Sequence, residues 1–378
     1  MSKHSSWIQI ILFTGFISLF FVLNLLLPDK GFSEQENREL AQNPKFTFAS
    51  LFEGKYTKKY ETYTTDQFAF RDGWTTLKAG SEIALGKKEN KGVYLCTDGS
   101  LIEKFSAPEK ELMDKNVAAV KSLSEKAGVP VYFALIPGAA DIRAAVLPKN
   151  APSYSQLETI DYCYKNSGAK NIDVYSALAS HADEYIFYNT DHHWTSLGAF
   201  YGYSAMMDAM GLPHAPLTDY SPQLVSKDFY GTVYSKSGFS WTKPDSIETF
   251  AEQDAATEVF NYPKDEPVAG AMYHPDFLEK KDKYSMFMGG ITPLIKVSTK
   301  NTDAPSLLVL RDSYMDSVTP LMQENFSEIH IMDLRYYKSK LMDSTVADYI
   351  AANKIDEVLV CYSVNNFATD TNVFLMGN

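Results

Sequence analysis

The sequence predicts an α/β fold with a mostly parallel sheet flanked by helices, preceded by a membrane-spanning helix. Short apolar runs alternate with amphipathic helical patterns from about residue 107, as in successive βαβ units. An uncharged run at residues 7–27 is long enough to cross a bilayer. We divide the chain into a tail and anchor (1–28), a stalk with an N-terminal extension (29–105) and an α/β domain (106–378) that carries a β-rich or irregular insertion (214–300).

The anchor reads WIQIILFTGFISLFFVLNLLL. A cleaved signal peptide usually has a shorter apolar core and a small-x-small cleavage site, whereas this run continues as PDKG. Lys3 lies on one side of the run, and Lys30 and Arg38 lie on the other, so these charges alone do not set the orientation. A short tail before a first hydrophobic helix is typical of a signal anchor. We therefore expect the rest of the chain to be extracytoplasmic, attached to the cell membrane by this single helix.

The composition limits the classes of protein to consider. Hydrophobic residues make up 45% of the chain and aromatic residues 13%, which is enough for a substantial core. The net charge of −12 argues against a nucleic-acid partner, because such binding depends on basic side chains that neutralise phosphates. Cys96, Cys163 and Cys361 are too few and too scattered for a disulfide framework.

Each element of the fold has its own signal. Residues 47–85 show apolar residues at helical spacing, and residues 92–105 resemble a β-hairpin with Asp98-Gly99 at the turn. Further on, the predicted helices span 109–127, 154–167 and 195–210, and the predicted strands span 129–136, 171–174, 306–310, 328–332 and 357–361. Sites in parallel sheets form beyond the carboxyl ends of the strands. That rule points to segments 137–143, 311–317, 333–338 and 362–367.

The densest group of reactive side chains is the segment TDHHWT at residues 190–195, just before a predicted helix. Asp191 could orient His193 as a general base for a nucleophile from elsewhere, because residues at i and i+2 can meet in a loop. Asp191, His192 and His193 could instead bind a metal such as zinc or manganese. A third interpretation is purely structural, with Thr190 or Asp191 capping the helix and Trp194 packing.

A second signal follows the apolar strand at 306–310, where the chain continues as Arg311-Asp312-Ser313. A serine there would lie at the carboxyl edge of the sheet, near a helix N-terminus whose N–H groups could stabilise an oxyanion. Asp-Ser also begins ordinary helices as a cap, so the serine gains significance mainly from the Asp/His segment. Arg335 and Asn365 follow the next two strands and could donate to an oxyanion or to a substrate, or form a surface ion pair and a turn.

Five ordered motifs together resemble the DHHW family of Gram-positive bacteria. They are TDHHWTSLGA (190–199), GTVYSKSG (231–238), Asp-Ser-Tyr (312–314), DLRYY (333–337) and the pair formed by Glu36-Asn37-Arg38 with the Asp66 to Arg71 segment. The resemblance covers most of residues 30–370. This family is similar to the alginate O-acetylation proteins of Gram-negative bacteria, which contain an SGNH-hydrolase-like domain.

The resemblance implies an SGNH-hydrolase-like fold and a triad of Ser313 as nucleophile, His193 as base and Asp191 as orienting carboxylate. It also implies acetyl transfer to an exported cell-surface polysaccharide, beside a multi-pass membrane acyltransferase that delivers the acetyl group. We expect no cofactor and no bound metal. Transfer prevails over hydrolysis only if the site favours the sugar over water, so an esterase is the nearest variant.

The chain departs from the usual SGNH pattern next to the serine. Arg311 stands where Gly-Asp-Ser has its glycine, and the usual Gly and Asn blocks have no clear match. The oxyanion or substrate donors are therefore left open among Arg335, Asn365 and Tyr314.

Two functions of other classes remain as alternatives. A metal-dependent phosphoesterase would use the Asp-His-His ligands and needs further ligands, for which Asp173, His181 and Asp183 are the nearby candidates. A catalytically silent polysaccharide-binding or scaffold subunit of a synthesis complex would need no triad. A Ser313 Oγ more than about 6 Å from both His193 nitrogens would favour this scaffold, because a working pair must approach hydrogen-bond reach.

Overall fold

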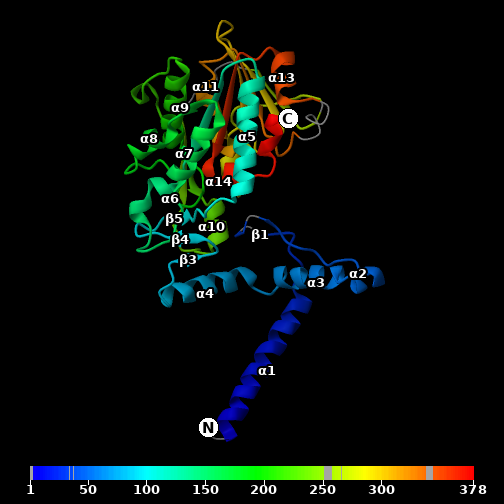
Figure 1. Ribbon diagram of the computed structural model, residues 1–378. Coiled ribbons are helices and arrows are strands. Elements are labelled where there is room, and N and C mark those ends of the chain that lie inside the picture. The colour runs from blue at the N-terminus through cyan, green and yellow to red at the C-terminus, as the bar shows by residue number, and fades with distance from the viewer. Residues whose placement is uncertain (1–2, 34, 37, 251–257, 265, 338–343) are drawn as a thin grey trace. The chain divides into compact units, whose positions relative to one another are not determined.

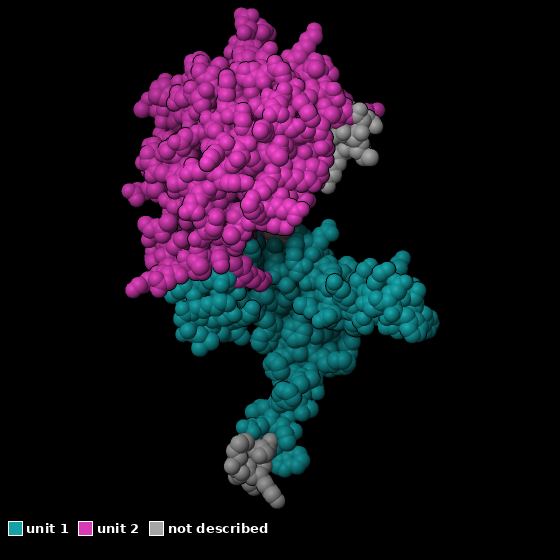
Figure 2. Space-filling model, in the orientation of Figure 1, with its two compact units in different colours: residues 1–90, 235–240 teal, residues 91–234, 241–378 magenta. Residues whose placement is uncertain are grey.

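The computed structural model describes residues 3–33, 35–36, 38–250, 258–264, 266–337 and 344–378. The chain forms two compact units, which Figure 2 shows in different colours. Unit 1 comprises residues 1–90 and 235–240, and unit 2 comprises residues 91–234 and 241–378.

Unit 1 is mostly helical. The apolar run forms α1 (Lys3–Leu26), and its segment Trp7–Leu26 is, within the described residues, the one helix long and apolar enough to cross a membrane. The helical prediction for residues 47–85 is confirmed as three helices, α2 (Phe48–Phe52), α3 (Lys55–Asp66) and α4 (Arg71–Ala84). Gly54 and Phe70 are the N-caps of α3 and α4, and their φ angles of 71° and 60° lie in the left-handed region, which a right-handed helix cannot include. Short strands β1 (Phe32–Ser33), β2 (Arg38–Glu39) and β3 (Glu89–Asn90) complete the unit.

An ion-pair network joins two of the motif segments within unit 1. Arg38 donates to both oxygens of Asp66 at 2.6 and 2.9 Å and to Glu36 at 2.8 Å, and Arg71 contacts Glu36 at 2.8 Å. The hydrogen bond from Arg38 is the main cause that lowers the pKa of Asp66 to about 2. These residues therefore hold the stalk against α3 and α4. Asn37 lies outside the described residues.

Unit 2 has the predicted mixed α/β architecture around a mostly parallel sheet of eight strands in the order β11-β10-β12-β14-β13-β15-β6-β7. The parallel strands are β6 (Val131–Ile136), β7 (Lys170–Ile172), β13 (Ser306–Arg311), β14 (Glu328–Met332) and β15 (Glu357–Ser363). β7 ends before Asp173 because that side chain caps the following helix by accepting from Ser176 N at 2.9 Å.

The segment 214–300 contains strands, as predicted, and three of them extend the central sheet. β10 (Glu258–Tyr262), β11 (Val268–Ala269) and β12 (Leu294–Ser298) add to its β14 edge by antiparallel pairing. β8 (Gln223–Phe229) and β9 (Asp245–Thr249) form a separate antiparallel pair, and α10 (Thr232–Ser237) lies between them in sequence. The predicted hairpin is confirmed as β4 (Val93–Leu95) and β5 (Leu101–Glu103).

Helices cover both faces of the sheet (Figure 1). One face packs on α8 (Val174–Ala179), α9 (Ser196–Met210) and α11 (Thr319–Met322), and the other on α5 (Lys110–Lys126), α7 (Gln156–Ser167), α13 (Val346–Asn353) and α14 (Val364–Thr369). Side chains of β13 alternate between the two cores, with Leu307 and Val309 on the α9 side and Leu308 and Leu310 on the α5 side. The strand ends are thereby fixed, and the candidate site is built on them.

Candidate active site

The Asp-His-His-Trp segment forms a buried loop that ends where Thr195 caps α9 by accepting from Gly198 N at 3.3 Å. Within this loop, Asp191 Oδ1 accepts from the backbone N of His193 at 2.9 Å and lies 2.6 Å from its ring Nδ1. Asp191 Oδ2 accepts from the backbone N of Thr232 at 2.7 Å and from its hydroxyl at 3.0 Å. Four donors therefore fix the carboxylate, and the i, i+2 arrangement brings it beside His193.

The other ring nitrogen of His193 reaches Ser313, 120 residues further along the chain. His193 Nε2 lies 2.8 Å from Ser313 Oγ, so the three side chains form one continuous hydrogen-bonded row. The His193 ring also stacks on Tyr284, with ring centroids 3.8 Å apart and planes inclined by 8°. Because the Asp191 carboxylate can only accept, Nδ1 carries the proton and Nε2 is free to accept from the serine hydroxyl.

Electrostatics keep Asp191 ionised. Burial works to raise the pKa of its carboxyl, but the charges of His192 and His193 and the hydrogen bonds from His193 and Thr232 outweigh burial and hold that pKa well below its ordinary value. Burial and the neighbouring charge of His193 lower the pKa of His192, whose Nδ1 lies 2.6 Å from the Thr232 hydroxyl. A fixed anion beside Nδ1 would stabilise the imidazolium if Nε2 took a proton.

Asp245, the first residue of β9, and Gly231 lie against the loop that carries Asp191. Neither the composition nor the spacing of the sequence indicated this role. Asp245 accepts from the backbone N of Asn189 at 2.9 Å and of Thr190 at 2.7 Å. Gly231 lies so close that a Cβ there would be 2.2 Å from Asp191 Cβ, a distance that no side chain tolerates. The motif at 231–238 therefore begins with glycine because Asp191 occupies the space.

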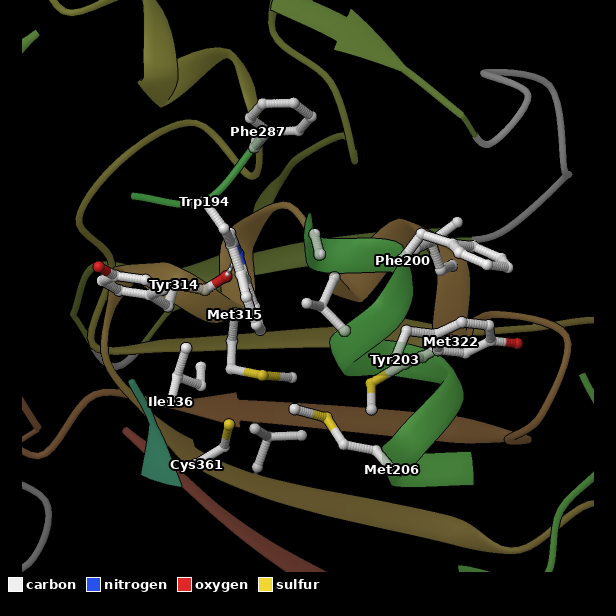
Figure 3. Packing of buried hydrophobic residues seen from close by; sticks show 14 of the residues in the cluster. Ile136, Trp194, Phe200, Tyr203, Met206, Phe287, Tyr314, Met315, Met322 and Cys361 are labelled. Carbon is white, nitrogen blue, oxygen red and sulfur yellow. Dashed lines mark hydrogen bonds between the residues drawn. The ribbon is translucent and has the colours of Figure 1, made fainter. Parts of the chain in front are cut away.

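Trp194 joins the histidine loop to the serine turn. Its Nε1 donates to Tyr314 O and to Ser317 Oγ, both at 3.0 Å, and the indole lies against Tyr314 and Met315 in the core (Figure 3). On its other side, a Cβ at Gly202 of α9 would lie 2.6 Å from the indole ring. The tryptophan thus sets the distance between His193 and Ser313.

The serine turn is anchored by Asp312 and not by a long helix. The segment after β13 is a short 3₁₀ helix, Ser313–Asp316, followed by α11, so the helix whose N-terminus was expected near Ser313 is a single 3₁₀ turn. Asp312 Oδ1 accepts from Tyr314 N at 3.1 Å, and Oδ2 accepts from Ser363 N and Asn366 Nδ2, both at 2.8 Å. In the described part of the chain, the backbone N–H of Ser313 has no acceptor. That group is therefore available to an oxyanion.

The residue before this turn makes a buried ion pair. Arg311 is 1% exposed, and its Nη2 lies 2.9 Å from Asp316 Oδ1. Its place on β13 puts it on the same face as Leu307 and Val309, in the core that also holds α9. Burial raises the pKa of the Asp316 carboxyl to about 7 against the opposing charge of Arg311.

The three candidates for oxyanion or substrate binding lie in different surroundings. Tyr314 is buried, and its hydroxyl donates to the backbone carbonyl of His192, so its side chain is already committed. Arg335 donates from Nε and Nη2 to Asp333 at 2.9 and 2.7 Å. Asn365 is exposed and lines a small cavity of about 60 Å³ together with Asp191, His192, Tyr314, Asn366 and the hairpin segment 101–105.

The metal interpretation concerns Asp191, His192 and His193. Ligand atoms of Asp191, His192 and His193 lie within 4.8 Å of one another. Both oxygens of Asp191 and both ring nitrogens of His193 are, however, engaged with Thr232, Ser313 and each other, so a metal would have to displace those bonds. His181 pairs with Glu184, and Asp173 caps α8, so neither joins the cluster.

Known proteins identify the family. A family model described as DHHW protein matches residues 78–332. The chain belongs to the DHHW family. A DHHW family protein from Eubacterium siraeum shares its fold with a TM-score of 0.66 and 23% identity, over 77% of this chain and 96% of that chain. Bacillus cereus PatB1, solved with a sulfonyl adduct, gives a TM-score of 0.61 and 20% identity over 75% of this chain and 97% of its own.

A sequence relative is the Pseudomonas putida protein named "Probable alginate O-acetylase AlgJ". It is 24% identical over 172 residues, which are 43% of this chain and 45% of the relative. The chain therefore matches less than half the length of that relative.

Proposed function

We propose that this DHHW protein is a membrane-anchored, extracytoplasmic serine O-acetyltransferase that modifies an exported cell-surface polysaccharide. The observation that carries the proposal is the unbroken row from Asp191 through His193 to Ser313, with contacts of 2.6 and 2.8 Å. The relative named as an alginate O-acetylase supports the reaction class, and the sulfonyl adduct of PatB1 is consistent with an activated nucleophile on this fold.

The reaction would proceed in two balanced steps. Ser313 Oγ attacks the acetyl carbonyl while His193 Nε2 takes the hydroxyl proton, and the donor leaves with that proton as an acetyl ester forms on Oγ. A sugar hydroxyl then attacks this ester and loses its proton to Nε2, and Ser313 leaves and takes the proton back. Asp191 stays ionised throughout and stabilises the imidazolium. The free Ser313 N–H would donate to the oxyanion in both steps.

The donor and the location are further parts of the proposal. We propose that a multi-pass membrane acyltransferase supplies the acetyl group and that α1 holds the protein beside it. In this arrangement the polysaccharide is the acceptor, and water is the competing acceptor that would make the protein an esterase. The 2.8 Å contact between Ser313 and His193 supports an enzyme over the silent scaffold alternative, which would not need that contact.

The test is acetyl transfer by the purified full chain in mild detergent, with p-nitrophenyl acetate as donor and an alginate oligosaccharide as acceptor. Ser313→Ala should lower release of nitrophenol and acetylation of the sugar together, by about 10³-fold or more, because the acetyl ester cannot form. The matched control is Ser180→Ala, an exposed serine just after α8, which should react like the wild type. Equal activity of Ser313→Ala and the wild type would contradict the proposal.

A further inference from the structure

Unit 1 exposes an unusual amount of large apolar surface outside α1. Phe48 and Phe52 of α2 are 71% and 87% exposed, and Leu77 and Leu85 of α4 and its cap are 58% and 87% exposed. Phe46 and Phe70 are also more than half exposed. So many large exposed apolar side chains within residues 46–85 indicate an interaction surface, since single exposed leucines are ordinary but such a concentration is not.

The large apolar residues of α4 and its caps share one face. The exposed Phe70, Leu77 and Leu85 and the half-buried Trp74 recur at the spacing of a single helical stripe. The opposite face of α4 is occupied, because Ala79 is buried and the hydroxyls of Thr75 and Thr76 accept from Gln35. The helix is therefore amphipathic, and on its apolar face Trp74 packs against α1 whereas Leu77 and Leu85 are exposed.

Direct contacts with α1 place that face at membrane depth. The Trp74 ring meets Phe16 and Phe20 of α1, with centroids 6.1 and 5.4 Å apart, and Phe68 stacks on Phe20 at 5.6 Å. Asn24, near the end of the apolar run, accepts from the backbone N of Ala69 at 2.7 Å. Phe20 lies about 9 Å before Leu26 along a helix that rises 1.5 Å per residue. The rings that touch it therefore lie within the half of the bilayer that holds the C-terminal end of α1.

The segment from Phe46 to the end of α3 also has the composition of a surface that lies at the membrane interface. Rings of Phe46, Tyr56, Tyr60 and Tyr63 follow one another along α3 with centroids 5.1, 5.7 and 5.8 Å apart. Residues 45–90 contain eight basic and six acidic side chains, whereas the whole chain carries a net charge of −12. Tyrosine, tryptophan and lysine beside exposed phenylalanine are typical of segments that lie at the headgroup level.

We infer that residues 46–85 form a juxtamembrane platform that lies in the bilayer interface, with the apolar side chains of α2 and α4 inserted among the lipids. In Figure 1 these helices lie across the end of α1, as such a platform requires. The inference rests on the anchor proposed above and is independent of the triad. A second contact zone would restrict tilting of α1, which a single spanning helix leaves free.

The test measures the depth of spin labels on the full chain in phosphatidylcholine liposomes. Single cysteines replace exposed side chains in Phe52→Cys, Leu77→Cys and Leu85→Cys, with Phe13→Cys of α1 and Ser180→Cys of unit 2 as references. The native cysteines are all buried, so labelling is directed to the new ones. At the three platform positions, the ratio of accessibility to oxygen over accessibility to a water-soluble nickel chelate should be severalfold higher than at Ser180→Cys and should approach that at Phe13→Cys.

The outcomes separate the platform from the anchor. A lipid-exposed label at Phe13→Cys with water-exposed labels at the platform positions would leave the anchor in place and overturn the platform. Labels shielded from both oxygen and nickel would also overturn it, because they would indicate a protein partner or a second copy on this surface. Water-exposed labels at Phe13→Cys as well would contradict the anchor itself.

Discussion

Replacing Asp191 by asparagine is expected to lower kcat/KM for an activated acetyl ester by about 10³- to 10⁴-fold. The carboxylate accepts from four donors, two on His193 and two on Thr232, and an amide has only one oxygen to offer them. If the amide nitrogen faces His193, it favours the tautomer with the proton on Nε2, which cannot accept from Ser313. If it faces Thr232, it disrupts the contact that holds the loop. Steady-state kinetics with p-nitrophenyl acetate measure the loss.

The two adjacent histidines provide a matched pair for the same assay. His193→Ala should lose activity to a similar extent as Asp191→Asn, whereas His192→Ala should retain far more, because His192 bonds to Thr232 and makes no contact with Ser313 among the described residues. If His192→Ala lost more activity than His193→Ala, His193 would not be the general base.

Arg311→Met is expected to destabilise the fold by about 3–5 kcal/mol, because it leaves the Asp316 carboxylate buried without its cation. The double variant Arg311→Met/Asp316→Leu should lose much less, since both charges are removed together and the volume is roughly kept. Urea unfolding of the full chain in mild detergent, followed by near-ultraviolet circular dichroism, measures both. Equal losses in the single and double variants would show that packing, and not the unpaired charge, determines the effect.

The same pair predicts a dependence on pH. Asp316 has a folded-state pKa of about 7, above its unfolded value, so the folded protein binds the extra proton and loses stability as pH rises from about 4 to 7. Removing Arg311 removes a charge that lowers this pKa, so the penalty should extend to higher pH. The deficit of Arg311→Met relative to the wild type should therefore be smaller at pH 5 than at pH 8. A deficit that does not change with pH would contradict this role of Asp316.

Much of the fold could be predicted because its signals are local. The apolar runs that form β6, β13, β14 and β15 are short, continuous and bounded by polar residues. This pattern is typical of buried parallel strands. The strands β10 to β12 could be recognised only as β-rich sequence, because their place at the edge of the central sheet depends on pairing with distant residues such as those of β14. Sequence periodicity carries no information about such pairing.

The residues of the site also fall into two groups: those with a local signal in the sequence and those that only the fold brings together. Asp191, His193 and Ser313 stood out because reactive side chains gathered at a helix start and at a strand end. Asp245 and Tyr284, which hold the loop and the His193 ring, are ordinary residues of the segment 214–300, and only their folded contacts reveal them. Thr232 lies in the GTVYSKSG motif, but its bonds to Asp191 are likewise visible only in the folded chain. The side chains of Arg335 and Tyr314 looked free in sequence. In the structure, Arg335 pairs with the nearby Asp333, and the Tyr314 hydroxyl donates to the backbone carbonyl of His192, 122 residues earlier in the chain.

The central claim is that Ser313 is an activated nucleophile, and reaction with phenylmethylsulfonyl fluoride tests it most directly. Intact mass and peptide mapping of the treated full chain should show one sulfonyl group on Ser313. The adduct should be absent from Ser313→Ala and form far more slowly on His193→Ala, because the base that takes the serine proton is missing. A sulfonyl group on a different side chain, or equal labelling of the wild type and His193→Ala, would contradict the account.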